Sequence, residues 1–99
     1  MSDPNIVWLA PEGWDEGKIL DKIYEMIQKS AGDYNHSLQP KTPDYQNKKV
    51  HMEVEIPLFT IKGDITVKGR RIYVFLDCSW VVRGQAESFL SNKLKEVFG

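Results

Sequence analysis

The residues that could take part in acid–base chemistry fall on one side of a predicted β-structure. His51, Glu53 and Glu55 alternate with apolar residues, and Asp64 belongs to a second run with the same alternation. Alternate side chains of a strand point to the same side, so these ionisable groups should share the solvent-facing surface. General acid–base catalysis needs such a group in a cleft that shifts its pKa. The pattern therefore favours surface charge, and we predict no catalytic residue.

The other reactive residue types also lack a supporting pattern. His36 has no second ligand at a spacing typical of metal sites. Cys78 is the sole cysteine, so no internal disulfide can form, and its place at strand spacing predicts a small core side chain. Gly63 and Gly69 fit neither the dinucleotide-binding nor the P-loop glycine spacing. The sequence thus predicts no enzyme, no metal site and no cofactor.

Hydrophobic periodicity indicates the strands that carry these residues. Between Val50 and Cys78, apolar and polar residues alternate almost without interruption. Pro57 cannot donate a ladder hydrogen bond and should mark a bend, and Lys68-Gly69 supplies the glycine that a tight hairpin needs. The predicted antiparallel strands are 50–57, 59–68 and 70–78. Their apolar side should form the main buried surface of the fold.

Two amphipathic helices should cover that apolar side. Residues 15–30 repeat apolar side chains with a period of about 3.6 residues, and the residues that follow Trp80 do the same. We expect the second helix to begin between Ser79 and Arg83 and to run to the end of the chain. The fold class is then α+β, a three-stranded antiparallel meander with two helices packed on one face.

A short apolar segment near the start of the chain adds one element. Ile6–Ala10 is bounded by turn-forming residues, which indicates either a buried strand or a strap laid over the sheet. As a strand it would pair beside 50–57 or beside 70–78 and protect an open edge. The predicted order of elements is (β)-α-β-β-β-α.

Length and charge narrow the class of protein. The 99 residues suit one domain spanning 1–99, with a polar, flexible loop at about 33–49. The 13 Lys and Arg residues and 14 Asp and Glu residues leave a formal net charge of −1, which counts against nucleic-acid binding. No apolar stretch is long enough to span a membrane, and no leader pattern opens the chain. We expect a cytoplasmic protein without a membrane span.

The outer face of the predicted sheet carries a candidate contact patch. Tyr73 and Phe75 are two residues apart on one strand and point away from the core, together with Arg71, while Lys62 faces out from the neighbouring strand. Such a pair of rings is a platform for stacking a base or for docking a partner. The alternative is that the N-terminal segment or the long loop covers them.

Two resemblances to RNA-binding families concern the same elements. The order α-β-β-β-α is that of double-stranded RNA-binding domains, and the run Lys68-Gly69-Arg70-Arg71-Ile72-Tyr73-Val74-Phe75 resembles the aromatic strand of an RNA recognition motif. The last helix begins Val82-Arg83-Gly84-Gln85-Ala86, with one basic residue where double-stranded RNA-binding domains have a lysine-rich motif. These similarities imply an RNA-binding surface on the sheet.

A further resemblance covers the C-terminal part of the chain. From Ile61, the run IKGDITVKGRRIYVFLDCSWVVRGQAESFLSNKLKEVFG resembles the C-terminal half of the polyhydroxyalkanoic acid system (granule-region) proteins. Residues 33–49 and Ile6–Ala10 depart from that family's pattern. The resemblance implies a non-enzymatic cytoplasmic accessory protein at polyester granules, and it transfers no site residue.

Three functional hypotheses follow. The first is a non-catalytic binding module that contacts a protein partner, a granule surface or a second copy of itself through a sheet edge. The second is a small RNA-binding domain that uses the outer sheet face. The third is a carrier of apolar ligands, in which the C-terminal helix grips a curved sheet around a pocket between Phe89, Trp80 and Ile65.

Overall fold

Three long strands form the antiparallel meander that the alternating sequence predicts. They are β3 (Lys49–Ile56), β4 (Phe59–Lys68) and β5 (Arg71–Asp77). The computed structural model of the chain describes residues 3–33, 38–40, 42–56 and 58–99. The register pairs Val50 with Ile65 and Ile65 with Val74, so the apolar positions of all three strands line up on one face. The predicted bend at Pro57 lies outside the described residues.

Two further strands extend the sheet to the order β1-β5-β4-β3-β2, all antiparallel. The N-terminal segment forms β1 (Ile6–Leu9) and pairs with β5, which decides between the two predicted positions. The short strand β2 (Leu38–Pro40) pairs with β3 and was not predicted. It falls within the segment 33–49, which is therefore not a loop throughout. Pro40 is tolerated there because β2 is an edge strand.

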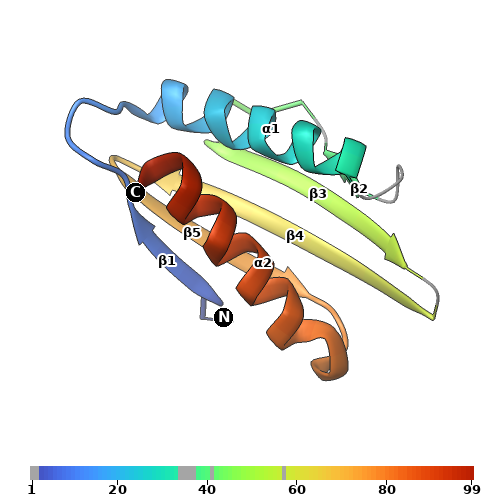
Figure 1. Ribbon diagram of the computed structural model, residues 1–99. Helices are drawn as coiled ribbons and strands as arrows, with labels where there is room; N and C mark the ends of the chain where they lie inside the picture. The colour runs from blue at the N-terminus through green and yellow to red at the C-terminus, as the bar shows by residue number, and fades with distance from the viewer. Residues whose placement is uncertain (1–2, 34–37, 41, 57) are drawn as a thin grey trace.

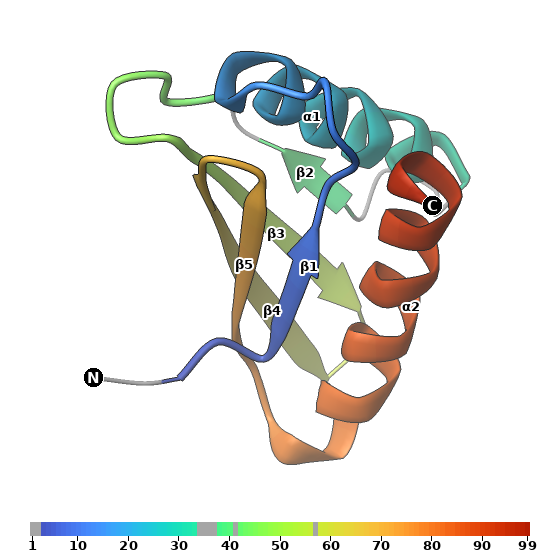
Figure 2. The same ribbon diagram turned by 90° about the vertical axis from the view of Figure 1, so that its left-hand side faces the viewer.

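Both helices, α1 (Glu16–Asp33) and α2 (Trp80–Phe98), lie over the same face of the sheet (Figures 1 and 2). One cluster of buried side chains joins the two layers. Its fully buried members include Ile19, Ile23, Val50, Ile65, Val74 and Leu94. The predicted α+β class, with both helices on one face and an N-terminal strand, is confirmed.

Side chains just before each helix define where it begins. The Asp15 carboxylate accepts a hydrogen bond from the Lys18 backbone N–H at 2.8 Å. The Ser79 hydroxyl accepts one from the Val81 N–H at 3.4 Å, and Gly99, which follows the last residue of α2, donates its N–H to the Lys95 carbonyl. These caps satisfy backbone groups that have no partner inside the helix. They fix the ends of the two helices over the sheet.

The tight turn between β4 and β5 also follows from the sequence. Lys68 pairs with Arg71, so only Gly69 and Arg70 form the loop. Gly69 has φ +61°, a conformation that glycine adopts at little cost. The Glu16 carboxylate accepts a hydrogen bond from the Gly69 N–H at 3.0 Å, which ties this hairpin to the start of α1.

Because both helices lie on one side, they leave the opposite face of the sheet uncovered (Figure 2). This surface, here called the open face, carries the outward side chains of β1, β3, β4 and β5.

Within the described ranges, neither helix combines the length and apolar character needed to cross a membrane.

Candidate binding surface

A shallow groove of about 780 Å³ lies on the open face, around the two aromatic side chains singled out from the sequence. Tyr73 and Phe75 are half-buried in it, and their neighbours across β4 are Thr66 and Asp64. Lys49, Lys68 and Pro4 complete its lining. The groove thus combines two rings with polar and cationic side chains, which is a lining suited to binding a ligand with an aromatic part and a charge.

The N-terminal segment reaches this groove through Pro4 without covering both rings. The next outward residues on β1, Val7 and Leu9, are 57% and 58% exposed and lie beside Tyr73 and Arg71 in the register. Apolar surface therefore continues from β5 onto the edge strand. Of the alternative expected from the sequence, cover by the N-terminal segment or the long loop, the described residues show a part: Pro4 lies at the groove, and both rings are half-buried.

The four residues of the sequence-predicted patch share the open face but not one site. Tyr73 and Phe75 line the groove, whereas Arg71 and Lys62 are not among its lining residues. Arg71 lies across from Lys68 at the hairpin end of the sheet. Lys62 lies toward the opposite end, across from Glu53 and Asp77. The cations that do line the groove are Lys49 and Lys68, which were not among the residues of the patch predicted from the sequence.

Charges on the open face are segregated along the strands. Lys49, Lys68 and Arg71 gather at the end of the sheet that holds the β4–β5 turn. Glu53, Glu55 and Asp77 lie toward the other end, where Lys62 is the interspersed cation. A nearly neutral chain can therefore present a locally basic surface, because its opposite charges are separated in space.

His51 sits at the boundary between these regions and contacts two carboxylates. Its Nδ1 lies 2.8 Å from Oδ1 of Asp64, and its Nε2 lies 3.3 Å from Oε1 of Glu53. Each ring nitrogen therefore faces a carboxylate of the protein itself. The contact with His51 holds Asp64 at the edge of the groove.

This three-residue cluster was not recognised as such from the sequence, although its members were noted as surface charges. A signal existed: His51 and Glu53 are two apart on one strand, which puts them on one side. The missing information was the register, which places His51 directly across from Asp64.

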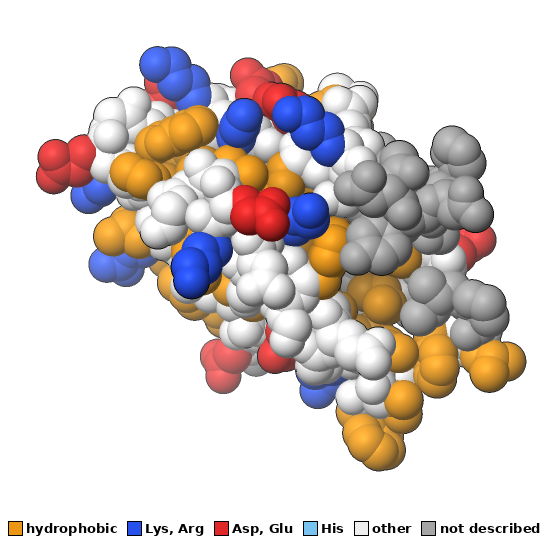
Figure 3. All heavy atoms as spheres, viewed as in Figure 1, with side chains coloured by type: hydrophobic (Ala, Val, Ile, Leu, Met, Phe, Trp, Pro, Cys, Tyr) orange, Lys and Arg blue, Asp and Glu red, His pale blue; other side chains and the backbone are white. Residues whose placement is uncertain are grey.

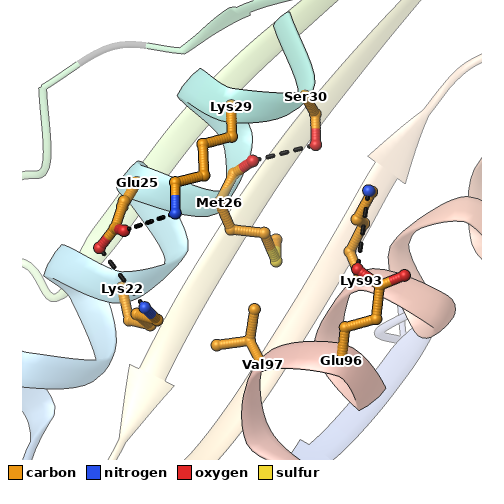
Figure 4. Close-up of a pocket in the computed structure, with 8 residues that line it drawn as sticks. All are labelled: Lys22, Glu25, Met26, Lys29, Ser30, Lys93, Glu96 and Val97. Carbon is orange, nitrogen blue, oxygen red and sulfur yellow. Dashed lines mark hydrogen bonds and ion pairs between the residues drawn. The ribbon is translucent and has the colours of Figure 1, made fainter. Parts of the chain in front are cut away.

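A second, smaller pocket of about 230 Å³ lies between the two helices (Figure 4). Each of its three lysines lies close to a glutamate: the Lys22–Glu25, Lys29–Glu25 and Lys93–Glu96 distances are 3.5, 3.0 and 3.7 Å. The hydrogen bond from Lys29, with the charge of Lys22, lowers the pKa of Glu25. Ser30 donates to the Met26 carbonyl at 2.9 Å. The polar groups of this pocket are thus engaged with one another, as in a solvated seam between helices.

Large apolar side chains are exposed at the end of the molecule that holds the β3–β4 turn and the start of α2 (Figure 3). Leu58 is 95% exposed and Trp80 is 80% exposed, and Val81 beside it is also exposed. Leu58 in addition has φ +75°, which is unfavourable for a residue with a Cβ atom. These three residues form what we call the apolar end. Because Trp80 lies in solvent, it does not close an internal pocket with Phe89 and Ile65.

Two other reactive residues were considered from the sequence, Cys78 and His36. Cys78 is half-buried just after the end of β5. His36 lies outside the described residues. In the part of the chain that the structure describes, no group of three or more His, Cys, Asp or Glu side chains is arranged to hold a metal ion.

Comparisons with protein-family models, with curated proteins and with solved structures found no match to this chain.

Proposed function

We propose that the protein is a non-catalytic binding module that contacts its partner through the open face of the sheet. The observation that carries this proposal is the groove around Tyr73 and Phe75 on a face that neither helix covers. Aromatic side chains contribute large contact area at low entropic cost, and they are typical of the centres of binding surfaces. The fold supports them on β5, which is paired on both edges.

The geometry around His51 supports binding over catalysis. A general base needs a free nitrogen within reach of a proton on the substrate. Here both nitrogens face carboxylates that belong to the protein itself. The role that fits is the positioning of Asp64 and Glu53 on the contact surface.

Affinity capture from a cell extract tests this proposal with three forms of the chain: wild type, the Tyr73→Ala/Phe75→Ala double variant, and a Leu58→Gly/Trp80→Gln variant of the apolar end. We expect a defined set of bound molecules that the first double variant loses and the second retains. Circular dichroism confirms that each variant is folded. Retention of the same set by the Tyr73/Phe75 variant would refute the use of the open face.

A second candidate function is supported by the apolar end. Exposed Leu58 and Trp80 side chains cost solvation free energy, and Leu58 also occupies a strained backbone conformation. Such features persist where function requires them. An accessory role at polyester granules, which the C-terminal sequence resemblance implies, would place these side chains against the granule surface.

Sedimentation with polyhydroxybutyrate particles tests the granule hypothesis. We expect the wild type and the Tyr73→Ala/Phe75→Ala variant to pellet with the particles, and the Leu58→Gly/Trp80→Gln variant to stay in solution. Each variant thus serves as the control for the other surface. Equal pelleting of all three forms would remove the apolar end from consideration.

A further inference from the structure

We propose that the ligand of the open face is single-stranded RNA, with its bases stacked on Tyr73 and Phe75 and its phosphates at the Lys49/Lys68 end. This inference rests on the proposed function of that face, and it names the ligand class that the groove fits.

The two rings are arranged for successive bases. They project from the same side of β5 and are two residues apart, which corresponds to about 6.8 Å along an antiparallel strand. Both are half-buried, so their positions are held while part of each ring remains accessible. Base stacking on aromatic side chains is tolerant of sequence because every base has a flat face. The groove therefore offers a platform rather than a closed pocket.

The cations of the face are placed for the phosphates. Lys49 and Lys68 line the same groove as the rings, and Arg71 lies next to Lys68 across the β4–β5 ladder. Among the described residues, these three cations make no ion pair within 4.0 Å. The backbone of Asp44 forms an isolated β-bridge with that of Lys49, and the Asp44 carboxylate offsets part of the positive charge of these three side chains. The formal charge of −1 for the whole chain does not oppose RNA binding here, because Glu53, Glu55 and Asp77 lie toward the other end of the face, and Asp64 is the one carboxylate among the groove's lining residues.

Asp64 distinguishes RNA from DNA in this arrangement. Its carboxylate lines the groove next to Phe75, and His51 holds one of its oxygens. The other oxygen can accept a hydrogen bond from a ribose 2′-hydroxyl, which deoxyribose lacks. A carboxylate would also repel a phosphate, so the sugar lies toward Asp64 and the phosphates lie toward the lysines.

Fluorescence anisotropy with a short labelled oligouridylate tests the inference. We expect binding at low salt, weakened about tenfold or more for each ring removed in Tyr73→Ala and Phe75→Ala. Log K should fall with log salt with a slope of about −2 if three phosphates are neutralised. Lys49→Gln/Lys68→Gln should make that slope shallower by about 1.4. Lys18→Gln/Lys95→Gln, which makes the same charge change on the exposed surface of the helices, should leave it unchanged.

Two further variants separate loss of stacking from loss of folding and test the preference for ribose. Tyr73→Phe/Phe75→Tyr keeps both rings and should bind normally, which separates loss of stacking from loss of folding. Oligodeoxyuridylate, which lacks only the 2′-hydroxyl, should bind the wild type more weakly than oligouridylate, and Asp64→Ala, which removes the acceptor, should reduce that preference.

No binding of oligouridylate at low salt, or equal binding by the ring-deleted variants, overturns the inference. Equal affinity for the ribose and deoxyribose forms overturns the assignment to RNA. If the oligonucleotide fails to bind while capture of another partner still depends on Tyr73 and Phe75, the RNA inference fails and the binding role of the face stands.

Discussion

Gly63 on β4 is a residue whose lack of a side chain is required by packing. A Cβ atom at this position would lie 2.8 Å from Cε and 3.2 Å from Cγ of Met52 on the neighbouring strand. The Met52 methyl can move, but Cγ is held closer to the backbone, so we expect Gly63→Ala to destabilise the fold by about 1–2 kcal/mol. Urea unfolding followed by circular dichroism measures this change.

Gly84 provides the matched control for that substitution. It lies on the exposed side of α2, and nothing comes within 4 Å of the position of its missing Cβ. Gly84→Ala should therefore stabilise the protein by about 0.5–1 kcal/mol, because alanine restricts the unfolded chain and favours a helix. A Gly63→Ala protein as stable as the wild type would show that Met52 repacks without cost.

Leu58 is the residue where stability and proposed function conflict. Its φ of +75° disfavours any side chain with a Cβ atom, and its 95% exposure gives no packing in return. Leu58→Gly should raise the free energy of unfolding by about 0.5–1 kcal/mol. The same variant should lose binding to polyester particles if the apolar end has the granule role. A less stable Leu58→Gly protein would instead indicate that Leu58 makes a stabilising contact.

At the scale of elements, the long strands and both helices could be predicted because their side-chain periodicity extends over seven or more residues. The strand predicted over 59–68 matches β4, and the helix predicted over 15–30 matches α1 with its end three residues later, at Asp33. The three-residue strand β2 could not be predicted, since so short a segment shows no period and contains Pro40. The helix boundaries at Asp15 and Ser79 depended on capping side chains that the sequence does show.

The candidate site was predictable only in part, for a related reason. Alternation within β5 places Tyr73 and Phe75 on the same outward side, and it needs no other strand. The partners Lys49, Lys68 and Asp64 come from β3 and β4, so their positions depend on the pairing register. A shift of one residue would move every outward side chain to the core side. The register is determined by packing of the whole sheet against the helices, which a single strand does not encode.

A hydrogen bond between a turn and a helix gives a prediction at the same scale. The Tyr45 hydroxyl, in the turn before β3, donates to the Asp21 carboxylate on α1. This bond to the carboxylate raises the pKa of Tyr45 above its ordinary value of 10.0. A raised folded-state pKa means that the stabilisation is complete below pH 10 and is lost as the pH rises through the folded value. Tyr45→Phe should therefore be less stable than the wild type at neutral pH, with a difference that shrinks in alkali.

Ultraviolet absorbance of phenolate follows this titration directly. Tyr45 should ionise at higher pH than free tyrosine, and Tyr45→Phe should remove that transition. Asp21→Asn should return the pKa of Tyr45 toward its ordinary value, because it removes the charged acceptor. An unchanged titration curve in Asp21→Asn would show that the contact does not persist in solution.

For the whole molecule, stability in acid depends on carboxylates distributed over both layers. The pKa of Glu25 on α1 is lowered by the hydrogen bond from Lys29 and the charge of Lys22, and the pKa of Asp44 is lowered by hydrogen bonds from Asn47. A lowered folded-state pKa means that the unfolded chain binds more protons, so both contributions are present above the ordinary values of 4.5 and 3.8 and are lost as the pH falls below them. The urea midpoint should decline over that range.

The two contributions can be separated, because their physical origins differ. Glu25→Gln and Asp44→Asn should each make the acid decline shallower than in the wild type. High salt should remove most of the Glu25 effect, since ion pairs between exposed side chains are screened. It should leave most of the Asp44 effect, because the hydrogen bond from the neutral Asn47 side chain does not depend on a cation. If salt abolishes both effects equally, the pKa of Asp44 is lowered mainly by the nearby charge of Lys49 and not by the hydrogen bonds from Asn47.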